Sequence, residues 1–162
     1  MEFFVLPFQL GEMERYVLWF TGEIDGVLTD GDGHIAAFLS AKAATIFAND
    51  RKLQVAPESS ALVDLRWIQE NSLTPDNIDS VNALNAWNFF ADVAASLPDK
   101  GAPFIAQDRR LNATYDKLFW GNNLPSVTPA GECYEPAWSG EEVVEMQALL
   151  RYGVELVVRS LK

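Results

Sequence analysis

Residues 74–97 read TPDNIDSVNALNAWNFFADVAASL and predict a long helix near the middle of the chain. Thr74 is a suitable N-cap, and Pro75 is favoured at the first helical position because it has no backbone N–H to leave unpaired. Apolar residues recur at helical spacing, and a second apolar stripe beside the first leaves little polar surface. A helix that is apolar on most sides is expected in the interior of a fold. The two stripes are Ile78, Val81, Leu84, Trp87, Ala91 and Ala94, and Ala86, Phe90, Val93 and Leu97.

The residues before this helix are rich in β-branched and aromatic side chains, which favour strands. Strands are expected at residues 3–8, 16–22 and 34–39, joined as an antiparallel meander. The reversals are expected at residues 11–14 and 29–33, where glycine and aspartate tolerate the backbone angles that tight turns require.

Two shorter helices are also expected. Residues 41–49 are rich in alanine and follow Ser40, a good N-cap, with Ile46 and Phe47 as the side chains to be buried. Residues 109–119 would bring three apolar side chains together on one side of a helix, namely Leu111, Tyr115 and Leu118.

A last helix is predicted to begin at Ser139, because Ser139 and Glu142 match the capping box, in which each side chain satisfies a backbone donor of the other residue. Gly153 could end this helix and leave residues 154–159 as a strand. We favour one helix to about Ser160, at a cost of about 1 kcal/mol for an interior glycine, because one polar face continues through it. That face consists of Gln147, Arg151, Glu155 and Arg159.

Strands followed by helices predict an α+β fold. We expect an antiparallel sheet from the N-terminal third, packed on one face against the C-terminal helices. No repeat, linker or low-complexity tract divides the sequence, so residues 1–162 are expected to form a single domain.

The chain is strongly acidic, with 23 acidic and 12 basic residues and a formal net charge of −11. This charge disfavours direct binding to nucleic acid or to an anionic membrane, because both repel it. It favours a cationic protein partner through long-range attraction. The alternative is that the acidic surface serves solubility alone.

The sequence also predicts the cytoplasm as the compartment. Cys133 is the one cysteine, so no disulfide can form within the chain. The first residues lack the basic segment of a signal peptide, and no apolar run approaches the roughly 18 residues needed to cross a bilayer.

Catalytic and metal-binding signatures are scarce, and no cofactor, metal site or catalytic residue is predicted. His34 is the one histidine, and a hydrogen-bonded turn residue is the favoured interpretation. Asp30 and Asp32 suggest a calcium loop, but His34, Ile35 and Ala41 stand where an EF-hand needs its remaining ligands and glycine, so a turn is favoured. Cys133 is expected to be an inert, partly buried thiol.

Three segments of the second half carry a family resemblance: residues 84–97 (LNAWNFFADVAASL), 115–125 (YDKLFWGNNLP) and 132–142 (ECYEPAWSGEE). Together they resemble immunity proteins of bacterial contact-dependent growth inhibition and related polymorphic toxin systems. The resemblance covers about the C-terminal half and is a pattern of core aromatics and turn residues. It implies a protein that binds the C-terminal domain of a cognate toxin, commonly a nuclease, and neutralises it in the cytoplasm.

Most aromatic residues in these segments are expected in the core, namely Trp87, Phe90, Tyr115, Phe119 and Trp138. The expected contact residues for a basic toxin domain are acids on predicted loops and one aromatic anchor. They are Asp25, Asp30, Asp32, Glu132, Tyr134 and Glu135.

Two other classes of function stay open on the sequence. A small enzyme could use carboxylates such as Glu132 and Glu135, which would then have to lie close together in a deep pocket. An adaptor or assembly subunit would instead associate with itself or with a partner other than a toxin.

Overall fold

The computed structural model of the chain describes residues 1–58, 60–97, 104 and 109–162. Its first element is a hairpin of β1 (Glu2–Leu10) and β2 (Met13–Thr21), paired antiparallel from Glu2 opposite Thr21 to Leu10 opposite Met13. The turn consists of Gly11 and Glu12, and Gly11 has a φ of +57°, which glycine adopts without steric cost. The predicted reversal is therefore confirmed, two residues shorter than the expected segment.

Two short strands extend the hairpin along β2. They are β3 (Gly26–Val27), opposite Trp19 and Phe20, and β4 (Ala37–Phe38), opposite Tyr16 and Val17. The strand expected at residues 34–39 is thus reduced to β4, preceded by single bridges of Ile35 to Thr29 and to Leu161.

The sheet is mixed, so the expectation of a purely antiparallel sheet is wrong. After α1 (Ala41–Asp50) the chain returns beside β1, where Phe3 N–H donates to the Gln54 carbonyl and Ala56 N–H donates to the Phe3 carbonyl. It continues into β5 (Val63–Asp64), which pairs parallel with β1. The helical crossover brings the chain back in the direction of β1, which is the geometry of a parallel pair.

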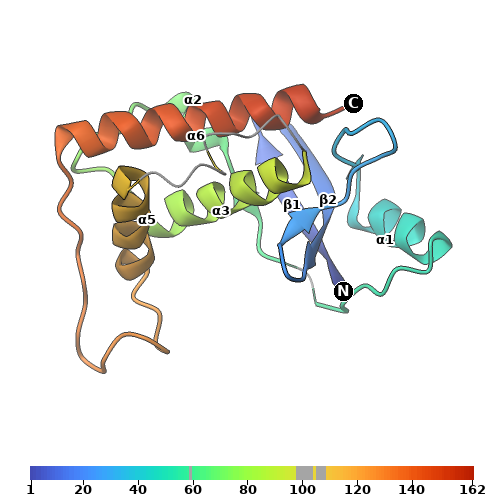
Figure 1. Cartoon of the computed structure of the whole chain (residues 1–162), viewed down its shortest axis with the longest axis horizontal. Helices are drawn as coiled ribbons and strands as arrows, with labels where there is room; N and C mark the ends of the chain where they lie inside the picture. Colours follow the sequence, from blue (N-terminus) through green and yellow to red (C-terminus); the bar gives the residue numbers. More distant parts are fainter. Residues whose placement is uncertain (59, 98–103, 105–108) are drawn as a thin grey trace.

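Helices cover both faces of the sheet, which corrects the expectation of helices on one face (Figure 1). On one face Phe3, Val5 and Leu18 pack with Ala44 and Ala48 of α1. On the other face the alternate residues of the hairpin, including Phe8, Leu10 and Val17, join the main core with the C-terminal helices. Residues 3–8 read FFVLPF, an unbroken apolar run, and such a run is typical of a strand buried on both faces.

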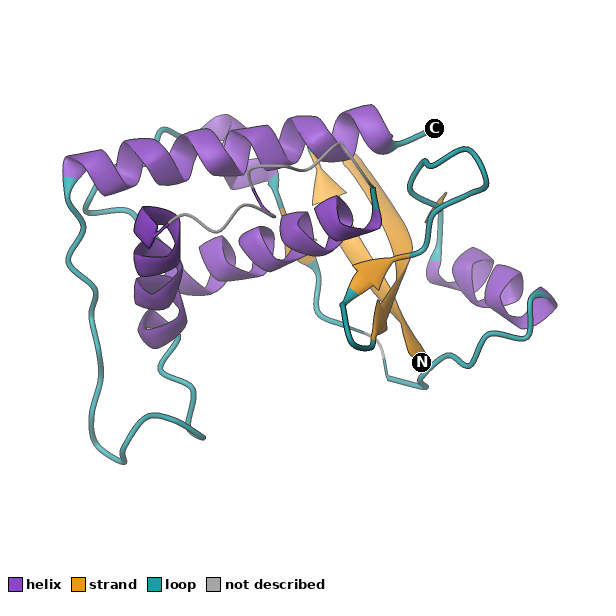
Figure 2. Cartoon of the chain, in the orientation of Figure 1, coloured by secondary structure: helices purple, strands orange, loops and turns teal. Residues whose placement is uncertain are grey.

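The main core is built around α3 (Ser80–Ser96), which lies between the sheet and α6 (Gly140–Ser160) (Figure 2). Central burial of this helix is confirmed, since eight of its residues are buried. Its predicted start is wrong: Asp79 is the N-cap, and its carboxylate accepts from the N–H groups of Val81 and Asn82. Thr74 instead forms a turn with Asn77.

Two further helices lie within the described residues, α2 (Arg66–Glu70) and α5 (Arg109–Gly121), and the second confirms the helix expected at residues 109–119. The capping box at Ser139 is present, and α6 runs unbroken to Ser160, as predicted. In α1, Ser40 is the N-cap as expected, but Ala44 and Ala48 are its buried residues and Ile46 is half exposed. Within the described residues, no helix has the length and apolar character needed to cross a membrane.

Candidate functional site

The loop of residues 122–139, between α5 and α6, is anchored by asparagine side chains. The Asn122 amide donates to the carbonyls of Leu118 (2.7 Å) and Ser80 (3.1 Å). Asn123 has a φ of +49°; its amide donates to the Tyr134 carbonyl (3.0 Å), and its amide oxygen accepts from the Tyr134 N–H (2.7 Å). This reciprocal pair closes the loop between residues 123 and 134. Both amides therefore bind backbone groups, close in the chain at Leu118 and Gly121 and farther away at Ser80 and Tyr134.

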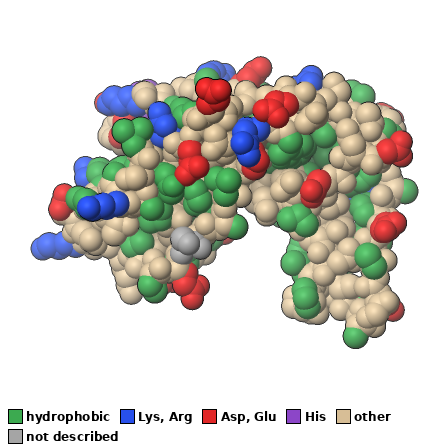
Figure 3. All heavy atoms as spheres, turned by 180° about the vertical axis from the view of Figure 1, so that it is seen from behind, with side chains coloured by type: hydrophobic (Ala, Val, Ile, Leu, Met, Phe, Trp, Pro, Cys, Tyr) green, Lys and Arg blue, Asp and Glu red, His purple; other side chains and the backbone are tan. Residues whose placement is uncertain are grey.

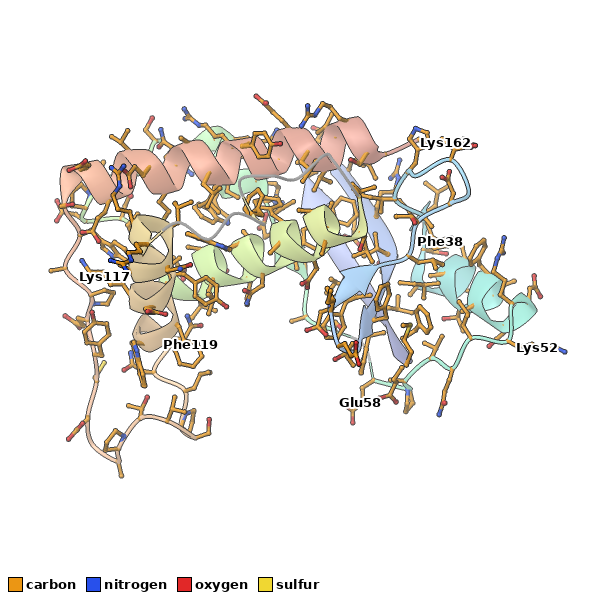
Figure 4. The ribbon with its side chains drawn as sticks, viewed as in Figure 1. Phe38, Lys52, Glu58, Lys117, Phe119 and Lys162 are labelled. Atoms are coloured by element: carbon orange, nitrogen blue, oxygen red, sulfur yellow. The ribbon has the colours of Figure 1, made fainter. Side chains whose placement is uncertain are left out.

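The returning end of the loop is held by α5. Lys117 Nζ donates to the Ala137 carbonyl (2.9 Å), lies 2.8 Å from a Glu142 carboxylate oxygen and sits 5.4 Å from the centre of the Trp138 ring. Figure 4 shows Lys117 and Phe119 on α5 at this end of the molecule. Lys117 and the Ser139 N–H hold the pKa of Glu142 below its ordinary value, against the effect of its partial burial. The loop thus projects from the helices with both of its ends fixed.

A groove of about 690 Å³ lies on this loop, and we call it the loop groove. Its apolar side chains include Trp120 and Tyr134, which are 47% and 43% exposed, and Trp120 packs edge-on against Phe119 at 5.3 Å between ring centres. Glu132 and Cys133 also line it, and Glu135 follows, exposed, one residue beyond Tyr134. Among the described residues, neither Glu132 nor Glu135 has a basic side chain within ion-pair distance. The loop groove therefore combines exposed aromatic surface with uncompensated negative charge.

Cys133 is exposed in this groove, so the expectation of a partly buried thiol is wrong. Glu132 and Glu135 are exposed as well. They do not form the deep pair of carboxylates on which the enzyme alternative depended.

Asp30 and Asp32 lie beside Lys162, which Figure 4 shows at the opposite end of the molecule from Lys117 and Phe119. Asp30 Oδ1 accepts from the N–H groups of Asp32 and His34, both at 2.9 Å, and Lys162 Nζ lies 3.5 Å and 3.4 Å from the carboxylates of Asp30 and Asp32. The pKa of Asp30 lies below its ordinary value, chiefly because its carboxylate accepts the hydrogen bond from the backbone N–H of His34. We call residues 29–35 the Asp30 turn; its interpretation as a turn between paired residues is confirmed by the bridge of Thr29 to Ile35.

The His34 imidazole joins the two carboxylates within 4.8 Å, which is close enough to suggest a cation site. However, Lys162 already supplies positive charge to both carboxylates, and Asp30 Oδ1 is occupied by two backbone donors. His34 Nδ1 itself makes no hydrogen bond to any residue that the structure describes, and it lies 3.6 Å from Asp30 Oδ1. The turn geometry and the lysine account for this cluster without a metal.

A third location was missed by sequence reasoning. Asp92 lies on the sheet-facing side of α3, half buried, and Asp92 Oδ2 accepts from the indole N–H of Trp19 at 2.8 Å. Burial raises the pKa of Asp92 to about 6; the Trp19 hydrogen bond opposes this shift and the charge of Asp25 adds to it. Asp25 itself accepts from Gly22 N–H in the turn after β2. The available signal was a polar row on an otherwise apolar helix, namely Asn85, Asn88 and Asp92, spaced three and four apart.

The predicted contact residues are therefore not one surface. Glu132, Tyr134 and Glu135 share the loop, Asp30 and Asp32 share the Asp30 turn, and Asp25 belongs with Asp92. Seen from behind, the molecule is hollowed between the end that carries the loop and the end that carries the sheet (Figure 3).

Comparisons with models of protein families, with curated proteins and with solved structures gave no match for this chain.

Proposed function

We propose that this protein is an immunity protein that binds and neutralises the C-terminal domain of a cognate, basic toxin in the cytoplasm. A nuclease is the expected toxin activity, as the resemblance in the C-terminal half implies. The observation that carries the proposal is the loop groove, in which Trp120 and Tyr134 are exposed beside Glu132.

The composition of the loop groove supports a protein partner. Tryptophan and tyrosine are enriched among residues whose truncation costs most at interfaces, because they bury a large area with few rotatable bonds. Tyr134 is suited to this role, since its backbone is held at both N–H and carbonyl by Asn123 while its side chain is exposed. Little ordering of the loop is then required when a partner binds.

The charge of the chain supports a basic partner. The formal net charge of −11 produces attraction at long range, and no basic side chain in the described part of the chain forms an ion pair with the acid of the loop groove, Glu132. Such complementarity chiefly increases the association rate and makes it sensitive to salt. An acidic toxin domain would gain nothing from this surface.

The test is binding and protection with the toxin domain encoded beside this gene. We expect tight 1:1 binding by calorimetry, weakened by added salt, and survival of cells that express both proteins. An unrelated basic domain of similar size serves as the control for charge alone. Absence of both binding and protection, or equal binding to the control domain, would overturn the proposal.

A further inference from the structure

A small pocket lies where α3 faces β1, β2 and residues 60–63. Its volume is about 230 Å³, and the residues that matter here are Leu6, Trp19, Leu62, Asn85, Asn88 and Asp92. Sites for whole small molecules are larger, about 300–1,000 Å³. The Asp92 pocket is therefore of a size for one side chain or another small group.

Among the described residues, no basic side chain forms an ion pair with the carboxylate in this pocket. The Trp19 indole is its one hydrogen-bond donor within the described part of the chain. The described titratable groups that act on it are Asp25, from the turn after β2, and Tyr115, from α5, and neither is a cation. A carboxylate drawn out of water without a cation is unfavourable, so Asp92 is an acceptor that the fold leaves incompletely satisfied.

The other groups in the pocket provide an apolar wall and further acceptors. Leu6, Leu62 and the Trp19 ring are apolar, whereas Asn85 and Asn88 contribute amides on the same side of α3 as Asp92. The Tyr115 hydroxyl donates to Asn88 Oδ1 at 2.9 Å, which fixes that amide and leaves its oxygen a second acceptor position. An aliphatic stem against the wall and a cationic head at the carboxylate would match this arrangement.

We propose that the Asp92 pocket binds one arginine side chain of the protein partner, an inference that rests on the proposed function. Arginine fits better than lysine because a guanidinium carries five N–H donors in a plane and can reach the carboxylate and an amide oxygen together. The charge-assisted hydrogen bond replaces the water that Asp92 has lost.

This assignment predicts a dependence on pH. Because the pKa of Asp92 is about 6, the carboxylate is ionised above that pH and neutral below it. Binding of a guanidinium is therefore expected to be strong above pH 6 and to weaken below it. Asp25 and Tyr115 do not reverse this direction, because one is an acid and the other a phenol.

The experiment is a titration of the full chain with methylguanidinium at constant ionic strength, followed by NMR at the Trp19 indole N–H. Trp19→Phe identifies that resonance. We expect a saturable shift at about pH 7.5, and about ten-fold weaker binding one pH unit below the pKa, where about a tenth of the carboxyls are ionised. Methylammonium, as the lysine analogue, is expected to bind more weakly.

Asp92→Asn removes the charge and keeps the shape, so it should abolish the shift. Asp76→Asn is the matched control, since it removes the same charge from an exposed position on the turn before α3. The proposal is overturned if the shift persists in Asp92→Asn, if Asp76→Asn loses it equally, or if methylammonium binds as well as methylguanidinium.

This titration needs no toxin, so its failure is distinct from a failure of the proposed function. Capture of the toxin domain with no methylguanidinium binding would refute the proposed arginine site in the Asp92 pocket and leave the immunity function standing. Methylguanidinium binding without capture of the toxin domain would refute the immunity function and leave a site for a guanidinium group.

Discussion

The loop groove and the Asp30 turn are both acidic, exposed at opposite ends of the molecule, and similar in sequence character. They differ in what their carboxylates already contact. At the Asp30 turn, the Asp30 carboxylate accepts hydrogen bonds from backbone N–H groups, and Lys162 forms ion pairs with both Asp30 and Asp32. At the loop groove, Glu132 and Glu135 have no such partners among the described residues, and aromatic side chains lie beside them. Negative charge marks a binding surface only where the fold has not already neutralised it.

The same comparison separates stability from binding. Hydrogen bonds to Asp30 hold a turn that is closed by the bridge of Thr29 to Ile35, and Ile35 also bridges to Leu161 near the end of the chain. The hydrogen bonds of the loop instead involve Asn123 and the backbone of Tyr134, and within the described residues the side chains of Tyr134, Glu132 and Glu135 make no hydrogen bond or ion pair. We therefore expect substitutions at the turn to change folding and substitutions at the groove to change binding.

The largest expected effect is on the free energy of unfolding, through the packing of α6 on α3 in the main core. In Gly153→Ala the added methyl group would overlap with the Phe90 ring where α6 crosses α3. We expect a loss of about 2–3 kcal/mol in the free energy of unfolding from overpacking. Urea denaturation followed by tryptophan fluorescence and circular dichroism measures it.

Gly140→Ala is the matched control for that variant, because its methyl group would meet open space at the start of α6. Equal stability of the two variants would contradict the close packing of α6 on α3. Separate unfolding transitions by the two probes would show that the regions do not belong to one cooperative domain.

Tyr134→Ala should weaken toxin binding by about 10- to 100-fold, or about 1.4–2.8 kcal/mol, with the free energy of unfolding unchanged. The reason is that the truncated side chain is exposed whereas the loop is held through the backbone. Calorimetry with the toxin domain and thermal denaturation measure the two quantities. Leu39→Ala, an exposed truncation beyond the Asp30 turn, is the control, and equal losses from both would remove the distinction between the ends.

Asp92→Asn should raise the free energy of unfolding at neutral pH by about 1 kcal/mol, after allowance for solvent screening. The pKa of Asp92 rises from 3.8 to about 6 on folding, chiefly through burial, so the folded state holds more protons between these values. Stability therefore falls as pH rises through that window, and the variant escapes this loss. Denaturation curves across the window would contradict the assignment if the two proteins differed equally at its acidic and neutral ends.

The smallest effects are expected from removing negative charges at the loop groove and at the Asp30 turn. Glu132→Gln with Glu135→Gln should slow association with the toxin domain about two- to five-fold at low salt, since rim charges act mainly on the association rate. Asp32→Asn with Asp30→Asn should leave that rate within error and lower the melting temperature instead. Stopped-flow association and thermal denaturation separate the two outcomes.

The pH dependence of stability provides a further test of the role of Asp30 in the turn. Because hydrogen bonding lowers the pKa of Asp30 in the folded state, its contribution to stability is present above the ordinary value and is lost as pH falls through the folded value. The difference between the wild type and Asp30→Asn should therefore shrink in acid. A constant difference would show that the hydrogen bonds to Asp30 are not its cause.

Local signals predicted much of the secondary structure. The capping box at Ser139, the N-cap at Ser40 and the Gly11 turn all act between residues close in the chain, so the sequence contained the complete motif. Thr74 and Pro75 formed an equally plausible cap, but Asp79 satisfies two backbone donors and α3 begins there. Competing local motifs of similar strength are decided by which helix start allows the apolar face to pack.

The candidate site was less predictable. Tyr134 and Glu132 were expected at a contact surface, and the structure adds Trp120 to the groove that they line. Asp92 was missed, because its significance depends on Trp19, 73 positions away in sequence, and on Asp25. Neither contact has a signature in the residues adjacent to Asp92.

The sequence by itself determined the α+β character, the hairpin turn, the helix caps and the buried centre of α3, since each follows from residue patterns within a few turns or one strand. Only the tertiary structure decided that the sheet is mixed, that helices lie on both of its faces, and which acids are neutralised. These properties depend on contacts between distant segments. Pairing direction and charge compensation are set by where the chain returns, and no local pattern encodes that position.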